Sequence, residues 1–251
     1  MQSVLKDRMR FANAASKTIL SGLNEQLAPV LKKIDIHYQS HSLEHLISPV
    51  PLRNALVDIY NNVGVYFAKN QLKGLSSKSA KLLMKDDVDD FDTDEWDKYV
   101  DDFIQTIGAK MIARITETTK MAVRDFISAA IKNGTGAAQL GIDLRKHFAD
   151  FNKVRSMVIA RTEVARAQNF GTFTAGAMSG YKLIDTWLHA GSSKDDRETH
   201  VAADGMQIDR GDTFKIDSNY SPAYPHDGTG GAEEECNCNC TFFSTPKNSE
   251  Y

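Results

Sequence analysis

The residues best suited to metal chemistry lie near the end of the sequence. Three cysteines, Cys236, Cys238 and Cys240, occupy alternate positions, and His200 and His226 precede them. Thiolate and imidazole groups are ligands that zinc prefers, and a bound ion would stabilise a segment with few apolar residues. We therefore identify His200, Cys236, Cys238 and Cys240 as candidate ligands of a structural zinc ion, with His226 as an alternative. The competing interpretation is that the cysteines pack as small apolar side chains, with His200 hydrogen-bonded in a turn.

A second candidate site lies in the first fifth of the chain. His41, Glu44 and His45 form an H-x-x-E-H pattern, in which two histidines bind zinc and the glutamate polarises water. The alternative function is therefore a metal-dependent hydrolase. Neighbouring serines and Pro49 disfavour a helix here, so we favour a polar connector. Because the sequence shows no nucleophile–base–orienter set, we expect a protein that is not an enzyme.

The charge of the chain is unevenly distributed. Residues 181–251 hold 13 acidic and 6 basic residues, a net charge of -7, and residues 86–102 hold 10 acidic and 1 basic, a net charge of -9. The remaining 23 basic and 10 acidic residues leave a net charge of +13, which allows weak, non-specific contact with DNA. No apolar run approaches the roughly 20 residues that a membrane helix needs, so we expect no membrane partner. Three cysteines within five residues exclude a disulfide framework and indicate a reducing compartment.

The elements that position these residues are mainly helical. Apolar residues recur at threes and fours from Leu5 to Ile34, with Pro29 predicting a kink or break, and again from Leu52 to Phe67. Residues 136–148 and 154–178 are expected to form two further helices. This patterning indicates a helical bundle.

The strongest helical pattern begins at Asp94, where Asp94 and Asp97 resemble a capping box. It ends at Asn133-Gly134, a pair typical of helix C-termini. The apolar spacing between these points predicts one nearly continuous long helix at the centre of the bundle.

After Gly180 the pattern changes to short apolar runs separated by glycine, proline and aspartate. The two most apolar runs lie around Trp187 and at the chain end, so pairing them in a sheet buries the most surface. We expect Cys238–Phe243 to pair with the strand around Trp187 and close a thin core that includes Val201 and Phe243. The fold class is therefore α+β: mainly an α-helical bundle with a long central helix, followed by a small loop-rich α+β module.

The motifs of this last region follow a characteristic order: Trp187 in a strand, the Asp195-Asp196-Arg197 turn with His200 three residues later, Asp204-Gly205, a proline-containing loop and Asn237-Cys238-Asn239-Cys240. The order resembles the C-terminal signature of the phage Mu F-like, or phage head morphogenesis, family. An upstream segment, Ala160-Arg161-Thr162-Glu163, is also similar to that family. We expect Arg161 and Glu163 to form a packed ion pair.

The resemblance covers roughly residues 100–243 and implies three regions. Residues 1–95 correspond to a variable N-terminal helical region, residues 96–180 to the long-helix bundle and residues 181–251 to a small acidic module with a Cys-rich end. Two departures stand out: Asn239 replaces the usual arginine, and Cys236 is additional. The Cys-x-x-Cys pair that completes a four-cysteine zinc site in many relatives is also missing.

The resemblance also implies a function. It indicates a structural minor head protein, or minor capsid protein, associated with the portal vertex and with procapsid assembly, assisting DNA packaging or ejection. The implied partners are the portal protein and capsid or scaffold proteins. The implied locations are the interior of the virion head and, during assembly, the host cytoplasm.

Overall fold

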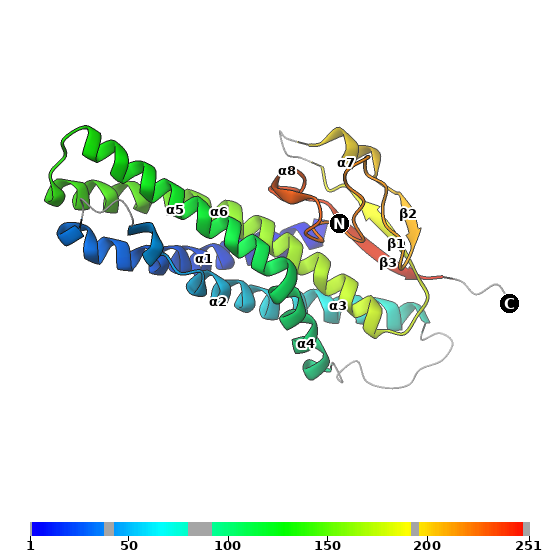
Figure 1. The fold of residues 1–251 in the computed structure, drawn as a ribbon. Helices are drawn as coiled ribbons and strands as arrows, with labels where there is room; N and C mark the ends of the chain where they lie inside the picture. Colours follow the sequence, from blue (N-terminus) through cyan, green and yellow to red (C-terminus); the bar gives the residue numbers. More distant parts are fainter. Residues whose placement is uncertain (1, 38–42, 80–91, 192–195, 248–251) are drawn as a thin grey trace. The chain divides into compact units, whose positions relative to one another are not determined.

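The computed structural model describes residues 2–37, 43–79, 92–191 and 196–247 (Figure 1). Within these ranges the chain is mainly helical and ends in a small antiparallel sheet, so the expected fold class is confirmed. None of the described helices combines the length and the apolar character needed to cross a bilayer.

The chain forms two compact units that are discontinuous in sequence. Unit 1 comprises residues 1–12, 59–102 and 161–251, and unit 2 comprises residues 13–58 and 103–160. The helices α1 (Gln2–His37) and α6 (Ala137–Met178) each contribute to both units. The domain boundaries expected from the sequence, 1–95, 96–180 and 181–251, remain a prediction.

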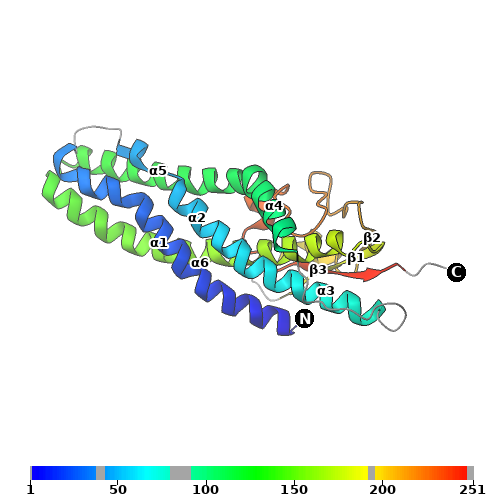
Figure 2. The same cartoon turned by 90° about the horizontal axis from the view of Figure 1, so that it is seen from below.

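Unit 2 is a helical bundle with its own apolar core. Figures 1 and 2 show α1, α5 (Ala109–Lys132) and α6 side by side in this unit. The shorter α2 (Val50–Ile59) and a 3-10 turn, Leu43–Leu46, also belong to it. The core is formed by buried aliphatic and aromatic side chains from these elements: Leu27, Val30, Ile34, Leu43, Ile47, Val123, Ile127, Leu140, Leu144 and Phe148.

The expected long helix is helical throughout but is not one α-helix. It consists of α4 (Thr93–Phe103), a π-helical turn at Ile104–Gly108 and α5. The capping-box expectation at Asp94 is wrong, because the Asp92 side chain accepts the hydrogen bond from the Glu95 backbone N–H at 2.8 Å. The expected end is confirmed: α5 stops at Asn133, and Gly134 adopts a left-handed φ of 66°.

Two other helix expectations need correction. Residues 136–148 and 154–178 belong to the single helix α6. The gap in apolar spacing misled the prediction, because Asn152 there is buried and donates a hydrogen bond to the Asn24 side chain at 3.0 Å. Pro29 also does not end α1, since it lies on an exposed position where the carbonyl group it leaves unbonded can reach water.

The helical part of unit 1 contains α3 (Val65–Ser79), α4 and the second half of α6. A π-helical turn, Tyr60–Gly64, precedes α3 and lies directly against α6. A Cβ atom at Gly171 would overlap the backbone carbonyl of Gly64, and a Cβ at Gly64 would meet the Trp96 ring. The close approach of these backbones therefore requires glycine.

The C-terminal module of unit 1 is built on a sheet with strand order β2-β1-β3. Its strands are β1 (Leu183–Leu188), β2 (Gln207–Asp209) and β3 (Thr241–Pro246). Trp187 lies opposite Phe242, so the terminal segment pairs with the strand around Trp187 as expected. The pairing runs over Thr241–Pro246, and Cys238 and Cys240 precede it. Two very short helices, α7 (Glu198–Ala202) and α8 (Gly231–Glu235), lie in the connections.

The core of this module differs in part from the expected one. It contains Trp187, Ala203, Phe214, Ile216, Tyr220, Cys238 and Cys240. Val201 is 46% exposed and Phe243 37% exposed, so neither is a core residue. The two cysteines take their place, as small side chains buried among aromatic rings.

The bundle core of unit 2 yields the first testable prediction. Ile127 is 3% exposed, whereas Met121 on the same helix is 57% exposed. Ile127→Ala should lower the free energy of unfolding by about 2–5 kcal/mol, because it leaves a cavity in a packed core. Met121→Ala should leave it nearly unchanged. Chemical denaturation of both variants measures the difference, and equal effects would show that α5 is oriented differently.

Candidate metal centre and its polar support

Three of the four predicted zinc ligands come together in the core of the C-terminal module. His200, Cys238 and Cys240 are all buried, and one ligand atom from each lies within 4.8 Å of the others. His200 Nδ1 is 3.5 Å from Cys238 Sγ and 3.6 Å from Cys240 Sγ. We call His200, Cys238 and Cys240 the His–Cys cluster. Cys236 is exposed and lies outside this cluster.

His200 is fixed on α7 by its neighbours. Its ring stacks on Tyr220 and meets Trp187 edge to face. Its Nε2 lies 2.9 Å from Glu234 Oε2. Burial alone would lower the pKa of His200, but the hydrogen bond and charge of Cys238, followed by those of Glu234, raise it above its ordinary value.

Arg197, immediately before α7, connects this helix to the cysteine segment. It donates from Nε to the Glu233 carbonyl at 2.6 Å and from Nη2 to the Cys236 carbonyl at 3.2 Å. The arginine and the histidine of the Asp-Asp-Arg motif therefore have different tasks. Arg197 hydrogen-bonds to backbone carbonyl groups of residues 233 and 236, and His200 faces the sulfur atoms of the two buried cysteines.

The two buried thiols are electrostatically coupled. Their mutual hydrogen bond lowers the pKa of Cys238 far below its ordinary value, and nearby histidines lower it further against the opposing effect of burial. The same interaction and burial raise the pKa of Cys240. A negative charge on one thiol therefore disfavours ionisation of the other.

The second half of α6 supports the cysteine segment with polar side chains. Asn169 Nδ2 donates to the Cys240 carbonyl at 3.2 Å, and Thr162 Oγ1 accepts from the Asn237 backbone N–H at 3.3 Å. Gln168 Nε2 donates to Thr241 Oγ1 at 2.8 Å. These contacts fix the backbone on both sides of the cysteines.

A buried charge network lies beside these contacts. Arg166 bridges two carboxylates: it pairs with Glu163 and donates from Nη2 to Glu235 Oε2 at 2.7 Å. Tyr60 donates to Glu163 at 3.4 Å, and the Gly228 backbone N–H donates to Glu235 at 2.7 Å. All three charged side chains are at most 5% exposed.

This network corrects the expectation of an ion pair between Arg161 and Glu163. Arg161 is exposed, and the partner of Glu163 is Arg166. Residues two apart on a helix point to different faces, whereas residues three apart share one.

Sequence analysis missed two residues near the cluster. Arg8 reaches it from the start of α1 and donates to the carbonyls of Asn239 at 2.9 Å and Cys240 at 3.2 Å. Burial lowers the pKa of Arg8 to about 10, although the charges of the two cysteines raise it in part. No sequence signal joins Arg8 to residues more than 230 positions away.

The second missed residue is His189, whose position could have been predicted from the expected strand pairing. It follows the β1 strand, whose Leu188 lies opposite Thr241. Extending the expected pairing by one residue places His189 beside Cys240.

The alternative ligand His226 is engaged elsewhere. Its Nδ1 lies 3.1 Å from Asn169 Nδ2 and its Nε2 lies 3.0 Å from the Cys238 carbonyl. A neutral ring that accepts from Asn169 and donates to Cys238 satisfies both contacts. His226 therefore supports the cysteine backbone.

The H-x-x-E-H pattern lies only partly in the described residues. Glu44 and His45 belong to the 3-10 turn Leu43–Leu46, and His41 lies outside the described ranges. Glu44 Oε1 accepts a hydrogen bond from Arg124 Nε at 3.2 Å. The carboxylate of the proposed hydrolase thus has a structural partner.

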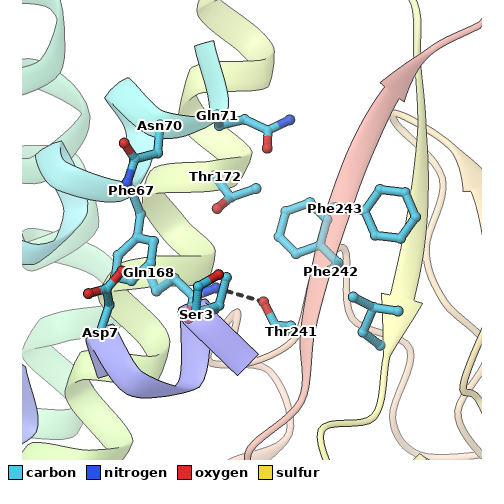
Figure 3. A pocket seen from close by; sticks show the side chains of 12 residues that line it. Ser3, Asp7, Phe67, Asn70, Gln71, Gln168, Thr172, Thr241, Phe242 and Phe243 are labelled. Carbon is cyan, nitrogen blue, oxygen red and sulfur yellow. Dashed lines mark hydrogen bonds between the residues drawn. The ribbon is translucent and has the colours of Figure 1, made fainter. Parts of the chain in front are cut away.

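Unit 1 also contains a cavity of about 600 Å³ between α1, α3, α6 and β3 (Figure 3). Its walls combine aromatic rings with amide and hydroxyl groups: Ser3, Asp7, Phe67, Asn70, Gln71, Gln168, Thr172, Thr241, Phe242 and Phe243. The Gln168–Thr241 hydrogen bond joins two of these lining residues (Figure 3). The cavity therefore adjoins the polar support of the cluster, and its described lining offers no nucleophile paired with a base.

Comparison with known proteins identifies the class of protein. Residues 121–243 match the family described as Phage Mu protein F like protein, which confirms the resemblance. The match indicates a phage head morphogenesis protein.

One curated relative is an uncharacterized protein, YqbB, of Bacillus subtilis (strain 168). It is 30% identical over 137 residues, which cover 53% of this chain and 45% of the relative. The match thus spans less than half of the relative's length. No solved structure matches the chain.

The buried charge network gives a second prediction. Arg166→Met should destabilise unit 1 by about 3–5 kcal/mol, because it leaves Glu163 and Glu235 buried without their cation. Arg161→Met, on the exposed face of the same helix, is the matched control and should change stability little. Thermal and chemical unfolding of the two variants distinguish them. Equal stabilities would contradict the bridging role of Arg166.

Proposed function

We propose that this protein is a structural minor head protein that associates with the portal vertex. The match of residues 121–243 to the phage Mu F-like family supports this. The observation that carries it is how the polar residues around the His–Cys cluster are used. Arg197 and Thr162, which belong to the signature motifs, bond to the backbone of the cysteine segment. Asn169 and His226 bond to that backbone and to each other, as expected of a docking module rather than of an enzyme.

The proposed partners follow from this role. The protein binds the portal protein, with capsid or scaffold proteins as further contacts, and enters the head interior during procapsid assembly in the host cytoplasm. It assists DNA packaging or ejection from there. The chain matches only part of its curated relative, so partners and location are proposals for this chain.

Co-expression with a portal protein from the same genome tests this function. We expect the tagged portal to retain the full chain through size-exclusion chromatography, and assembled heads to contain it. An Arg166→Met variant should lose this association, because the module that carries the signature is destabilised, whereas Arg161→Met should keep it. Heads that form with normal composition and infectivity without the protein would contradict the proposal.

We also propose weak, sequence-independent contact with DNA through unit 2. This unit holds 13 basic and 8 acidic residues, a net charge of +5, whereas unit 1 has 17 basic and 25 acidic residues, a net charge of -8. Such contact depends on phosphate neutralisation and is therefore lost steeply with rising salt.

We further propose that the His–Cys cluster binds a structural zinc ion. Zn–N bonds of about 2.0–2.1 Å and Zn–S bonds of about 2.3 Å place nitrogen and sulfur about 3.6 Å apart in a tetrahedral site. The His200 Nδ1 distances to the two sulfurs, 3.5 and 3.6 Å, fit this value. The residues present therefore suit the ion, which would crosslink α7 and the cysteine segment.

Metal removal tests the zinc proposal. Protein purified without chelator should contain one zinc ion per chain, measured by mass spectrometry of the metal. EDTA should lower the melting temperature of unit 1, because the binding energy of a structural ion contributes to folding. A His200→Ala variant should contain no zinc and show no response to EDTA. Wild-type protein that contains no zinc would contradict the zinc proposal and support the interpretation that the cysteines pack as small apolar side chains.

A further inference from the structure

His189 directly follows the central strand β1 and lies beside the His–Cys cluster. Its Nδ1 lies 3.6 Å from Cys240 Sγ. That is the separation seen between His200 Nδ1 and the same sulfur atom. It also equals the value of about 3.6 Å expected between nitrogen and sulfur ligands of tetrahedral zinc. His189 lies outside the three-residue group whose ligand atoms are all within 4.8 Å of one another, so its ring has to move toward the cluster to share the ion.

The two histidines share one orientation. Each turns Nδ1 toward the sulfur atoms and Nε2 toward a carboxylate. His200 Nε2 lies 2.9 Å from Glu234, and His189 Nε2 lies 3.5 Å from Asp196. Metal-bound histidines typically donate their second ring N–H to a carboxylate, which fixes the ring and the tautomer. Both rings are therefore oriented in the way that metal-binding histidines are.

The backbone holds His189 in this position. Its N–H donates to Asp204 Oδ1 at 2.8 Å. The neighbouring Gly205 N–H donates to the Trp187 carbonyl at 2.9 Å, and Gly205 has a left-handed φ of 80°. The Asp204-Gly205 turn thus fixes the end of β1. The side chain of His189 is 14% exposed, so it is mostly removed from solvent.

We infer that His189 is the fourth ligand of the zinc site, completing a Cys2His2 set with His200, Cys238 and Cys240. Asp196 and Glu234 are the orienting carboxylates. This inference rests on the zinc site proposed above and assigns to His189 the place that the sequence pattern gave to Cys236. Two thiolates and two neutral imidazoles balance the charge of Zn²⁺, which suits a buried site.

Cobalt substitution of the full-length protein tests the assignment. Tetrahedral Co²⁺ absorbs in the visible range, and its thiolate charge-transfer absorbance grows with the number of bound sulfurs. His189→Cys should raise that absorbance per bound ion in the ratio of three thiolates to two. Cys236→Ser, the matched control, should leave the spectrum and the zinc affinity unchanged.

Two further variants measure affinity by competition with a chromogenic chelator. His189→Ala should weaken zinc binding by more than the roughly 10–100-fold typical of losing an orienting carboxylate. Asp196→Asn should weaken it within that range. Because His189→Cys gives a gain of signal, it remains informative if His189→Ala folds poorly.

The outcomes separate the two proposals. Stoichiometric zinc together with loss of charge-transfer absorbance in Cys236→Ser would overturn the role of His189 and keep the zinc site. The same holds if His189→Cys leaves the spectrum unchanged. Wild-type protein that binds neither zinc nor cobalt would overturn both.

Discussion

The buried guanidinium of Arg166 is the interaction on which the organisation of unit 1 depends. It lies between Glu163 on its own helix and Glu235 at the end of α8, and it thereby joins α6 to the segment that carries the cysteines. Two carboxylates against one guanidinium leave an excess negative charge in a buried region. The hydrogen bonds from the Tyr60 hydroxyl and the Gly228 backbone N–H offset part of that cost. Because Arg166 contacts both carboxylates at once, it ties the position of Glu235 to α6.

The position of Glu235 then determines that of the cysteines. From residue 236 to residue 241 the backbone is held by Arg197 on one side and by Thr162, Asn169 and Arg8 on the other. These contacts are mostly to carbonyl and N–H groups, so they leave the thiol side chains free to face the module core. The result is two sulfur atoms buried beside His200 among the rings of Trp187 and Tyr220.

The C-terminal module has a thin apolar core, so the His–Cys cluster can contribute substantially to its stability. The module is small and much of its chain is loop, so apolar burial alone gives a limited stability margin. Our proposals assign the remaining stabilisation to a zinc ion held by two cysteines and two histidines. In that view, histidines supply what the missing Cys-x-x-Cys pair supplies in the four-cysteine relatives. A rigid module of this kind is suited to docking on a partner in an assembling head.

The sequence by itself determined the helical body, the long helix ending at Asn133-Gly134 and the closure of the module by pairing around Trp187, because apolar period and turn residues are local signals. It also identified His200, Cys238 and Cys240 as a candidate ligand set through residue type and spacing. Only the tertiary structure decided that Cys236 faces solvent, that Arg166 rather than Arg161 pairs with Glu163 and that α6 is one helix. It alone brought Arg8 to the cysteine segment. These features depend on contacts between residues distant in sequence, where burial and hydrogen-bond satisfaction override local pattern.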